Sequence, residues 1–368
     1  MTVSVAVNVQ AQPRDIQSFQ IQCQQRDRLS PDQQHTINQL LQVAQTEDCE
    51  EGDRILSNSP YLDLSDTRIR EIGILAAFPQ LTELYLTGNE IQDISALAML
   101  PNLQILALDY NQITDISPLT NLDAIAQLYL RNNQIENLAP LAKLEQLNHL
   151  EINNNQIIQT LTPLQALTRL TYLDLSGNQV SNIVPLSNLV NLENLILNRN
   201  RIESVMELAV LNRLTRLHLD SNQVINIEAL LTLDNLIDLD IDNNPVDEGD
   251  RRLIEQSVNI RRLGLENRCQ ACNLSELDFT GGDLIGVYLE GADLSGAILR
   301  NADLVGANLE YADLSGADLR GADLTSVLWT EADLSNANLA NAIIEAVDFD
   351  QVNLCGTTLP NLMIGRCE

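Results

Sequence analysis

Apolar residues recur through the middle of the chain in a frame that repeats every 22 residues. One copy holds Leu81, Leu84, Leu86, Asn89, Ile91, Ile94, Leu97 and Leu100. Its asparagine recurs at Asn89, Asn111, Asn133, Asn155, Asn178, Asn200, Asn222 and Asn244, and a single interval has 23 residues. A unit this short cannot bury its apolar face alone, so the pattern predicts stacked coils.

Each copy divides into three parts. The Leu-x-Leu pair, as in Leu84 and Leu86, alternates with period two and predicts a short strand with one buried face. The asparagine then follows where the chain turns inward, where its amide can satisfy buried backbone groups of its own and the adjacent coil. The later Ile-x-x-Leu-x-x-Leu run predicts a turn or short helix. The extra residue lies between Ile157 and Leu161, where we expect a local bulge over an intact core.

The frame Leu-x-x-Leu-x-Leu-x-x-Asn is the leucine-rich-repeat signature. Its 22-residue length resembles the internalin-like class of bacterial leucine-rich-repeat proteins. The resemblance implies a solenoid in the form of a horseshoe, with one strand per coil on the concave face.

A second apolar period, of five residues, begins at Leu274. Leucine or another large apolar residue recurs from Leu284 to Leu354, and Ala-Asp-Leu recurs from Ala292, Ala302, Ala312, Ala322 and Ala332. This segment resembles the pentapeptide-repeat family, which implies a right-handed quadrilateral β-helix with four pentapeptides per coil. The Cys269-x-x-Cys272 entry resembles the start of such repeats in photosynthetic bacteria.

The patterns divide the chain into four parts. Residues 1–57 form an N-terminal tail and helical cap, 58–245 the leucine-rich repeats, 246–272 a junction, and 273–368 the pentapeptide β-helix. Residues 1–11 resemble the end of a secretory signal peptide, with a disordered tail as the alternative. Ser30 and Pro31 predict the start of an amphipathic capping helix. A junction helix is expected over about 247–257, and its arginines either form solvated ion pairs or anchor the acidic domain that follows.

The formal net charge of −30 changes the range of possible partners. Such acidity argues against direct binding of nucleic acid or anionic membranes, which requires basic patches. No apolar run approaches the 18 residues of a membrane-spanning helix. Basic partners remain possible.

The pentapeptide geometry predicts two acidic ladders, because residues 20 apart stack between coils. One consists of Asp283, Asp303 and Asp323, and the other of Asp293, Asp313 and Asp333. With a rise of about 4.8 Å per coil, the charge density approaches that of duplex DNA. Some pentapeptide-repeat proteins mimic DNA and inhibit type II topoisomerases. The resemblance therefore implies an alternative function as a DNA mimic. The other interpretation is that the surface aspartates only keep the β-helix hydrated.

Cysteines are confined to the ends of the repeat arrays. Cys23 and Cys49 flank the capping helix, and Cys355 and Cys367 close the pentapeptide array. This placement predicts local disulfides and an oxidising compartment, periplasmic or secreted. Reduced, buried cysteines in a cytoplasmic protein are the alternative.

The sequence predicts neither an enzyme nor a cofactor. Phosphate-loop, Gly-x-Ser-x-Gly and His-Glu-x-x-His motifs are absent. A single Cys-x-x-Cys, without paired histidines, does not predict a metal site.

Surface recognition remains as the predicted activity. Outward positions of the predicted strands carry Tyr85, Ile105, Tyr110, Tyr129, Arg131 and Tyr172. Tyrosine and arginine are enriched at binding hot spots. The sequence therefore predicts a non-enzymatic scaffold whose concave face binds another protein or a glycan, with the pentapeptide helix as an acidic extension. Ordinary variation of side chains on a sheet is the alternative.

Overall fold

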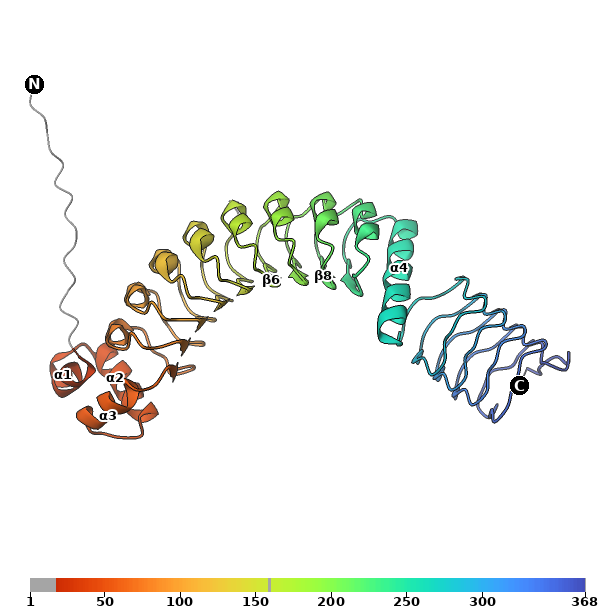
Figure 1. Cartoon of the computed structure of the whole chain (residues 1–368), viewed down its shortest axis with the longest axis horizontal. Coiled ribbons are helices and arrows are strands. Elements are labelled where there is room, and N and C mark those ends of the chain that lie inside the picture. Colours follow the sequence, from red (N-terminus) through yellow and green to blue (C-terminus); the bar gives the residue numbers. More distant parts are fainter. Residues whose placement is uncertain (1–17, 158–159, 368) are drawn as a thin grey trace, which may run out of the picture. The chain divides into compact units, whose positions relative to one another are not determined.

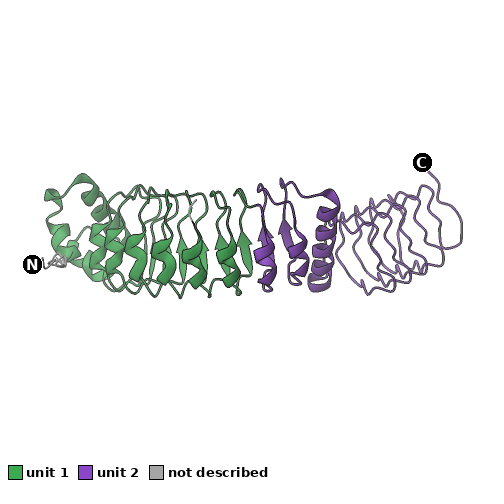
Figure 2. Ribbon diagram, turned by 90° about the horizontal axis from the view of Figure 1, so that it is seen from above, with its two compact units in different colours: residues 1–202 green, residues 203–368 purple. Residues whose placement is uncertain are grey.

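The computed structural model describes residues 18–157 and 160–367. The chain divides into two compact units, residues 1–202 and 203–368 (Figure 2). The first unit contains a helical cap and seven strands among its described residues. The second contains two further strands, a long helix and a β-helix.

Three α-helices close the start of the first unit: α1 (Phe19–Gln24), α2 (Pro31–Val43) and α3 (Cys49–Leu56), with a 3₁₀ turn at Arg26–Arg28. The sequence pattern predicts only α2, which begins at a capping box formed by Ser30 and Gln33. Phe19 is fully buried, and its ring centroid lies 5.6 Å from that of Phe78 in the first coil. The cap therefore covers apolar surface that the first coil would otherwise expose. The signal-peptide interpretation concerns residues outside the described part of the chain.

The strands of the first unit are three residues long and pair in parallel, in chain order (Figure 1). They are β1 (Tyr61–Asp63), β2 (Glu83–Tyr85), β3 (Ile105–Ala107), β4 (Gln127–Tyr129), β5 (His149–Glu151), β6 (Tyr172–Asp174) and β7 (Asn194–Ile196). Each strand buries its central residue, a leucine in every case. The predicted leucine-rich-repeat solenoid is confirmed.

The return side of each coil is a 3₁₀ helix. In the first unit these helices span Gly73–Ala77, Ser95–Met99, Ser117–Asn121, Ala139–Lys143, Thr162–Ala166 and Val184–Asn188. Short bonds such as Leu97 N–H to Ile94 C=O, at 3.0 Å, close each turn. Ile157 and Leu161, which flank the extra residue of the long copy, remain buried.

The repeated asparagines bond two coils at once. Asn111 Nδ2 donates to the carbonyls of Leu108 in its own coil and Leu86 in the preceding coil, both at 3.0 Å. Its Oδ1 accepts from Ile91 N–H in the preceding coil at 3.0 Å. In the first coil, Thr67 holds the asparagine position, and its hydroxyl donates to Leu64 C=O at 2.7 Å. Each such side chain satisfies backbone groups that the turn leaves buried.

The second unit begins with two coils and one long helix. Its strands are β8 (Arg216–His218) and β9 (Asp238–Asp240), its 3₁₀ helices are Met206–Val210 and Glu228–Thr232, and its helix is α4 (Glu248–Glu266). The expected helix over 247–257 is too short by nine residues at its C-terminal end. Ile254, Val258 and Leu263 of α4 are buried, and Leu263 packs into the core of the β-helix, so packing extends the helix beyond the predicted end.

Helix α4 connects the last leucine-rich coil to the β-helix through hydrogen bonds. Arg262 donates from Nε and Nη2 to Ile237 C=O at 2.9 and 2.6 Å. On the other side, Gln256 donates to Ser275 C=O and Asn259 to Asn273 C=O. Arg252 forms an ion pair with Glu276. The junction arginines thus form ion pairs and also anchor the helix to backbone carbonyls.

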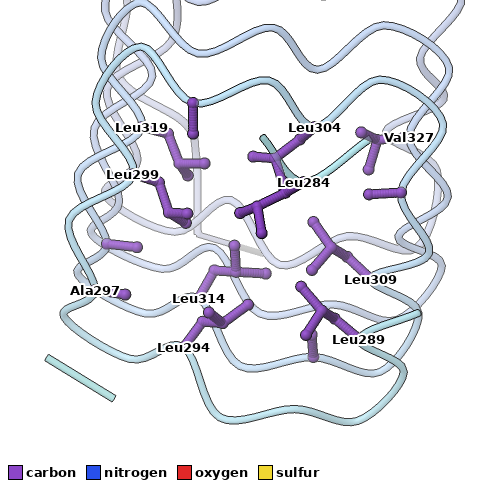
Figure 3. Close-up of a cluster of buried hydrophobic side chains, with 14 of the residues drawn as sticks. Leu284, Leu289, Leu294, Ala297, Leu299, Leu304, Leu309, Leu314, Leu319 and Val327 are labelled. Carbon is purple, nitrogen blue, oxygen red and sulfur yellow. The ribbon is translucent and has the colours of Figure 1, made fainter. Parts of the chain in front are cut away.

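The β-helix stacks residues 20 positions apart. Parallel bridges join Asp293 to Asp313 and Asp313 to Asp333, so one coil contains four pentapeptides. Leucine and alanine side chains fill its interior (Figure 3). The stacking begins at the bridge between Arg268 and Tyr288, before the first period visible in the sequence.

Three disulfides lie at the ends of these structures: Cys23–Cys49, Cys269–Cys272 and Cys355–Cys367. Cys269 and Cys272 occupy the inward positions 20 residues before Leu289 and Ala292, so a covalent link replaces a leucine–alanine contact in the first coil. No helix among the described residues is long and apolar enough to cross a membrane.

Candidate functional site

The strand face of the first unit carries two aromatic clusters. The first and third residues of the strands point away from the buried leucines, and the parallel register places these residues in two rows. Because the strands are rigid and regularly spaced, the side chains in each row have fixed neighbours. The central cluster comprises Tyr129, His149 and Tyr172, and the N-terminal cluster comprises Tyr61 and Tyr85.

In the central cluster His149 lies between two tyrosines. Its ring is stacked on Tyr172 with centroids 4.2 Å apart and planes inclined by 9°, and it lies 5.1 Å from the Tyr129 ring. His149 Nε2 is 2.8 Å from Glu151 Oε1. These contacts hold three amphipathic rings in one orientation, which lowers the entropy lost when a partner covers them.

Arg131 lies beside this cluster and joins two acidic side chains. Its Nη2 is 3.1 Å from Asp109 Oδ2, and its Nη1 is 3.1 Å from Glu151 Oε2. Asp109 also accepts from the Arg131 backbone N–H at 2.7 Å. Arg131 Nε is buried and has no hydrogen-bond partner within the described residues. The guanidinium is therefore held in place while its buried Nε–H donor has no partner among the described residues.

The pKa values reflect this burial and pairing. Burial raises the pKa of Asp109, and its hydrogen bonds from Arg131 act in the opposite direction. The contact with His149 lowers the pKa of Glu151. Burial raises the pKa of Asp174, the outward residue at the end of β6. The charge of the carboxylates beside the central cluster is thus only partly compensated.

The N-terminal cluster pairs tyrosines with carboxylates. The Tyr61 and Tyr85 rings are tilted, with centroids 5.4 Å apart. Tyr61 donates from its hydroxyl to Asp63 at 3.4 Å, and Tyr85 to Glu83 at 3.3 Å. Burial and then the neighbouring carboxylates raise the pKa of both tyrosines. Over the described residues, neither Asp63 nor Glu83 forms an ion pair.

The predicted face residues do not all occupy strands. Tyr85, Ile105, Tyr129 and Tyr172 lie at outward strand positions. Tyr110 and Arg131 do not, because β3 ends at Ala107 and β4 at Tyr129. Tyr110 adopts a left-handed conformation with φ of 55° in the following turn and is 59% exposed. The placement of these two residues within strands is therefore wrong.

Several residues in or beside the two clusters were not predicted as site residues from the sequence: Tyr61, Asp63, Glu83, Asp109, His149, Glu151 and Asp174. The repeat register contains the missing signal for His149. Residues 22 or 23 apart share a strand position, so His149 aligns with Tyr172 and with Gln127. Aligning every copy, and not only its tyrosines, would have placed the histidine between aromatic neighbours.

The acidic ladders are in register along the β-helix. Bridges connect Asp283, Asp303 and Asp323 in one row, and Asp293, Asp313 and Asp333 in another. Each carboxylate accepts from the backbone N–H two residues later, as Asp313 does from Ser315 at 2.8 Å. Asparagine does the same at Asn308 and Asn338. The aspartates therefore stabilise turns, a role that does not depend on their charge.

Other places in the described part of the molecule have fewer features of a functional site than the strand face. The described residues contain no group of three histidine, cysteine or acidic side chains that could hold a metal. A hollow of about 390 Å³ lies beside α4 and is lined by residues that include Asp240, Glu255 and Arg262. His218 lies 3.2 Å from Asp238 in the second unit.

Family models match both repeat regions. The model of leucine-rich repeats matches residues 61–99, 79–121, 101–142, 124–166 and 168–209. The model of pentapeptide repeats matches residues 272–310, 288–325 and 332–361. The fold and its strand face define a leucine-rich-repeat solenoid that is followed by a pentapeptide-repeat β-helix.

Comparison with solved structures shows which kind of leucine-rich-repeat protein the chain resembles. The chain is 30% identical to internalin C2 from Listeria monocytogenes, with a TM-score of 0.53, covering 55% of this chain and 91% of that one. It is 24% identical to the internalin InlF from the same species, with a TM-score of 0.50, covering 88% and 94%. Among curated proteins, no match is found. The chain belongs to the internalin-like leucine-rich-repeat proteins and carries an additional pentapeptide-repeat region.

Proposed function

We propose that this chain is a non-enzymatic binding protein whose strand face recognises another protein. The central cluster carries the proposal. Tyr129, His149 and Tyr172 present fixed aromatic surface, and Arg131 is held beside them between two carboxylates. Tyrosine and arginine are enriched among the few residues that dominate the binding energy at protein interfaces, and a fixed orientation limits the entropy lost on association.

A protein partner is favoured over a glycan because the face combines ion pairs with aromatic rings over several coils. Standard protein interfaces engage about 20–30 residues on each side, and repeated strands supply such an extended surface. The pentapeptide β-helix would act as an acidic extension of the scaffold. DNA mimicry receives no comparable support, since asparagine makes the same turn bond at Asn308 and Asn338 and the turns therefore do not require the charge.

The three disulfides support a periplasmic or secreted location. Disulfides persist in oxidising compartments and are rare in the cytoplasm. Labelling of free thiols in protein taken from intact cells tests this placement. Six protected cysteines are expected, and free thiols in most molecules would favour the cytoplasm.

Site-directed photo-crosslinking tests the binding face. A benzophenone amino acid at Tyr110, which is 59% exposed, should capture one identified protein from a display library of surface and secreted proteins. The same group at Val184, which is 52% exposed on a 3₁₀ helix, is the matched control. Capture at Tyr110 that Tyr129→Ala with Tyr172→Ala abolishes supports the proposal. Equal capture at Val184 opposes it.

A further inference from the structure

The two aromatic clusters differ in how their carboxylates are compensated. In the central cluster, Arg131 contacts both Asp109 and Glu151. In the N-terminal cluster, Asp63 and Glu83 accept from tyrosine hydroxyls, and Asp63 also accepts from the Ser65 backbone N–H at 2.9 Å. Within the described residues neither carboxylate pairs with a cation. The strand face therefore presents one aromatic surface whose carboxylates include two that pair with an arginine, and one whose carboxylates pair with no cation among the described residues.

The uncompensated cluster is also accessible. Tyr61 is 47% exposed, and Asp63 is exposed beside it. Tyr85 and Glu83 are half-buried on the adjacent strand, in parallel register with Asp63 and Tyr61. Two ring faces and two carboxylates are thus gathered on neighbouring strands, about 4.8 Å apart.

This chemistry matches a side chain that is both cationic and partly apolar. Lysine and arginine have methylene stems that cover aromatic surface and charged ends that carboxylates attract. A cation over a tyrosine ring is stabilised further by the ring quadrupole. Neutral apolar side chains would leave the two carboxylates without compensation, and acidic ones would be repelled.

We propose that the Tyr61–Tyr85 cluster, with Asp63 and Glu83, is the subsite that receives a lysine or arginine side chain of the protein partner. The inference rests on the proposed function, because it assigns the chemistry of one part of the same binding face. The partner must then present a basic residue to the end of the strand face that lies nearest the helical cap. The net charge of −30 favours approach of such a partner over long distances.

The raised pKa values of Tyr61 and Tyr85 agree with a negative potential at the cluster. After burial, the main causes are the carboxylates of Asp63 and Glu83, which disfavour a further negative charge on the phenols. A neighbouring cation would act in the opposite direction. The local potential at these rings is therefore negative.

Nuclear magnetic resonance with ring-labelled tyrosines tests the subsite in the full chain. The probes are a tripeptide with a central arginine, one with lysine, and one with citrulline, which is close in shape to arginine and uncharged. The arginine and lysine peptides should shift the Tyr61 and Tyr85 resonances saturably, and citrulline should bind at least threefold more weakly. Tyr311, which is 56% exposed on the β-helix, should not respond.

Variants that replace the two carboxylates by amides test the charge of the subsite while keeping its shape. Asp63→Asn with Glu83→Gln should weaken arginine-peptide binding at least fivefold. Asp123→Asn with Glu136→Gln removes the same charge from exposed positions elsewhere in the unit and should change binding less than twofold. Equal binding of citrulline, or equal effects of the two double variants, would overturn the subsite.

The two proposals fail in different ways. If the peptides produce no shifts while a captured protein still depends on Tyr129 and Tyr172, the basic subsite is wrong and the binding face stands. If the peptides bind Tyr61 and Tyr85 but crosslinking from Tyr110 captures no protein, the subsite chemistry stands and the proposed function fails.

Discussion

The side-chain oxygen of Asn111 accepts a hydrogen bond at 3.0 Å from the backbone N–H of Ile91, one coil earlier. The Asn111 amide nitrogen donates to carbonyls in both coils. One buried side chain therefore couples two repeats. The same arrangement recurs at Asn133 and Asn155, and it explains why the asparagine recurs in each copy of the frame.

Replacing this asparagine should destabilise the solenoid. Asn111→Ala leaves buried donors and acceptors in two coils without partners, at a cost of about 1–3 kcal/mol for each unsatisfied group before relaxation. We expect the free energy of unfolding in urea to fall by about 2–4 kcal/mol. Asn121→Ala, at an exposed position, should change it by less than about 0.5 kcal/mol. Equal effects of the two variants would refute the coupling role.

The Cys23–Cys49 disulfide should stabilise the cap more than Cys269–Cys272 stabilises the junction. The first closes a loop with a sequence separation of 26 residues, the second a separation of three. On the chain-entropy model the losses on removal are about 3.5 and about 1.6 kcal/mol. Urea unfolding of Cys23→Ala/Cys49→Ala and Cys269→Ala/Cys272→Ala measures both. A larger loss for the second pair would show that packing beneath α4, and not loop closure, dominates.

Removing Arg131 should make stability more dependent on pH. Asp109 already has a raised pKa because it is buried, and Arg131 is the group that opposes this rise. In Arg131→Met the pKa of Asp109 should rise further. A carboxyl whose folded-state pKa lies above its unfolded value destabilises the fold as pH rises through that interval. The variant should therefore lose about 1–3 kcal/mol at neutral pH and less under acidic conditions.

The control for this variant is Arg169→Met. Arg169 donates to the neutral Gln146 side chain at 2.6 Å and is exposed. Its loss should lower stability by less than about 0.5 kcal/mol, with no added pH dependence. Parallel pH profiles for both variants would contradict the assigned role of Asp109.

Asp313 should tolerate asparagine but not alanine. Its Oδ1 accepts from Ser315 N–H, and asparagine supplies the same acceptor at equivalent turns. Asp313→Asn should leave thermal stability nearly unchanged. Asp313→Ala should cost about 1 kcal/mol, the usual contribution of one such bond. If asparagine were as damaging as alanine, the carboxylate charge would have a role beyond the turn.

The two repeat folds follow from periodicity, because a residue at a fixed interval must meet the same neighbours in every coil. The leucines at the centres of the strands and the leucines inside the β-helix were predictable for this reason. Helices α1 and α3 were not, because their buried faces complement one end of the solenoid and have no repeat. The length of α4 likewise depends on packing partners that lie far apart in the sequence.

The candidate site was predictable only in part. Tyrosines on the strand face stand out by residue type, but the pairing of Arg131 with Asp109 joins residues 22 apart, one coil to the next. His149 gains its importance from Tyr172, which the 23-residue copy brings into register. Contacts of this kind require the register of every copy, including the one with the extra residue.

The most direct test of the account is the affinity of the captured protein for two matched double variants. Tyr129→Ala with Tyr172→Ala removes aromatic rings from the strand face, and Tyr288→Ala with Tyr311→Ala removes two exposed rings from the β-helix. Isothermal titration calorimetry should show at least a tenfold loss of affinity for the first pair, about 1.4 kcal/mol, and less than a twofold loss for the second. Loss of affinity confined to the β-helix pair would contradict recognition through the strand face.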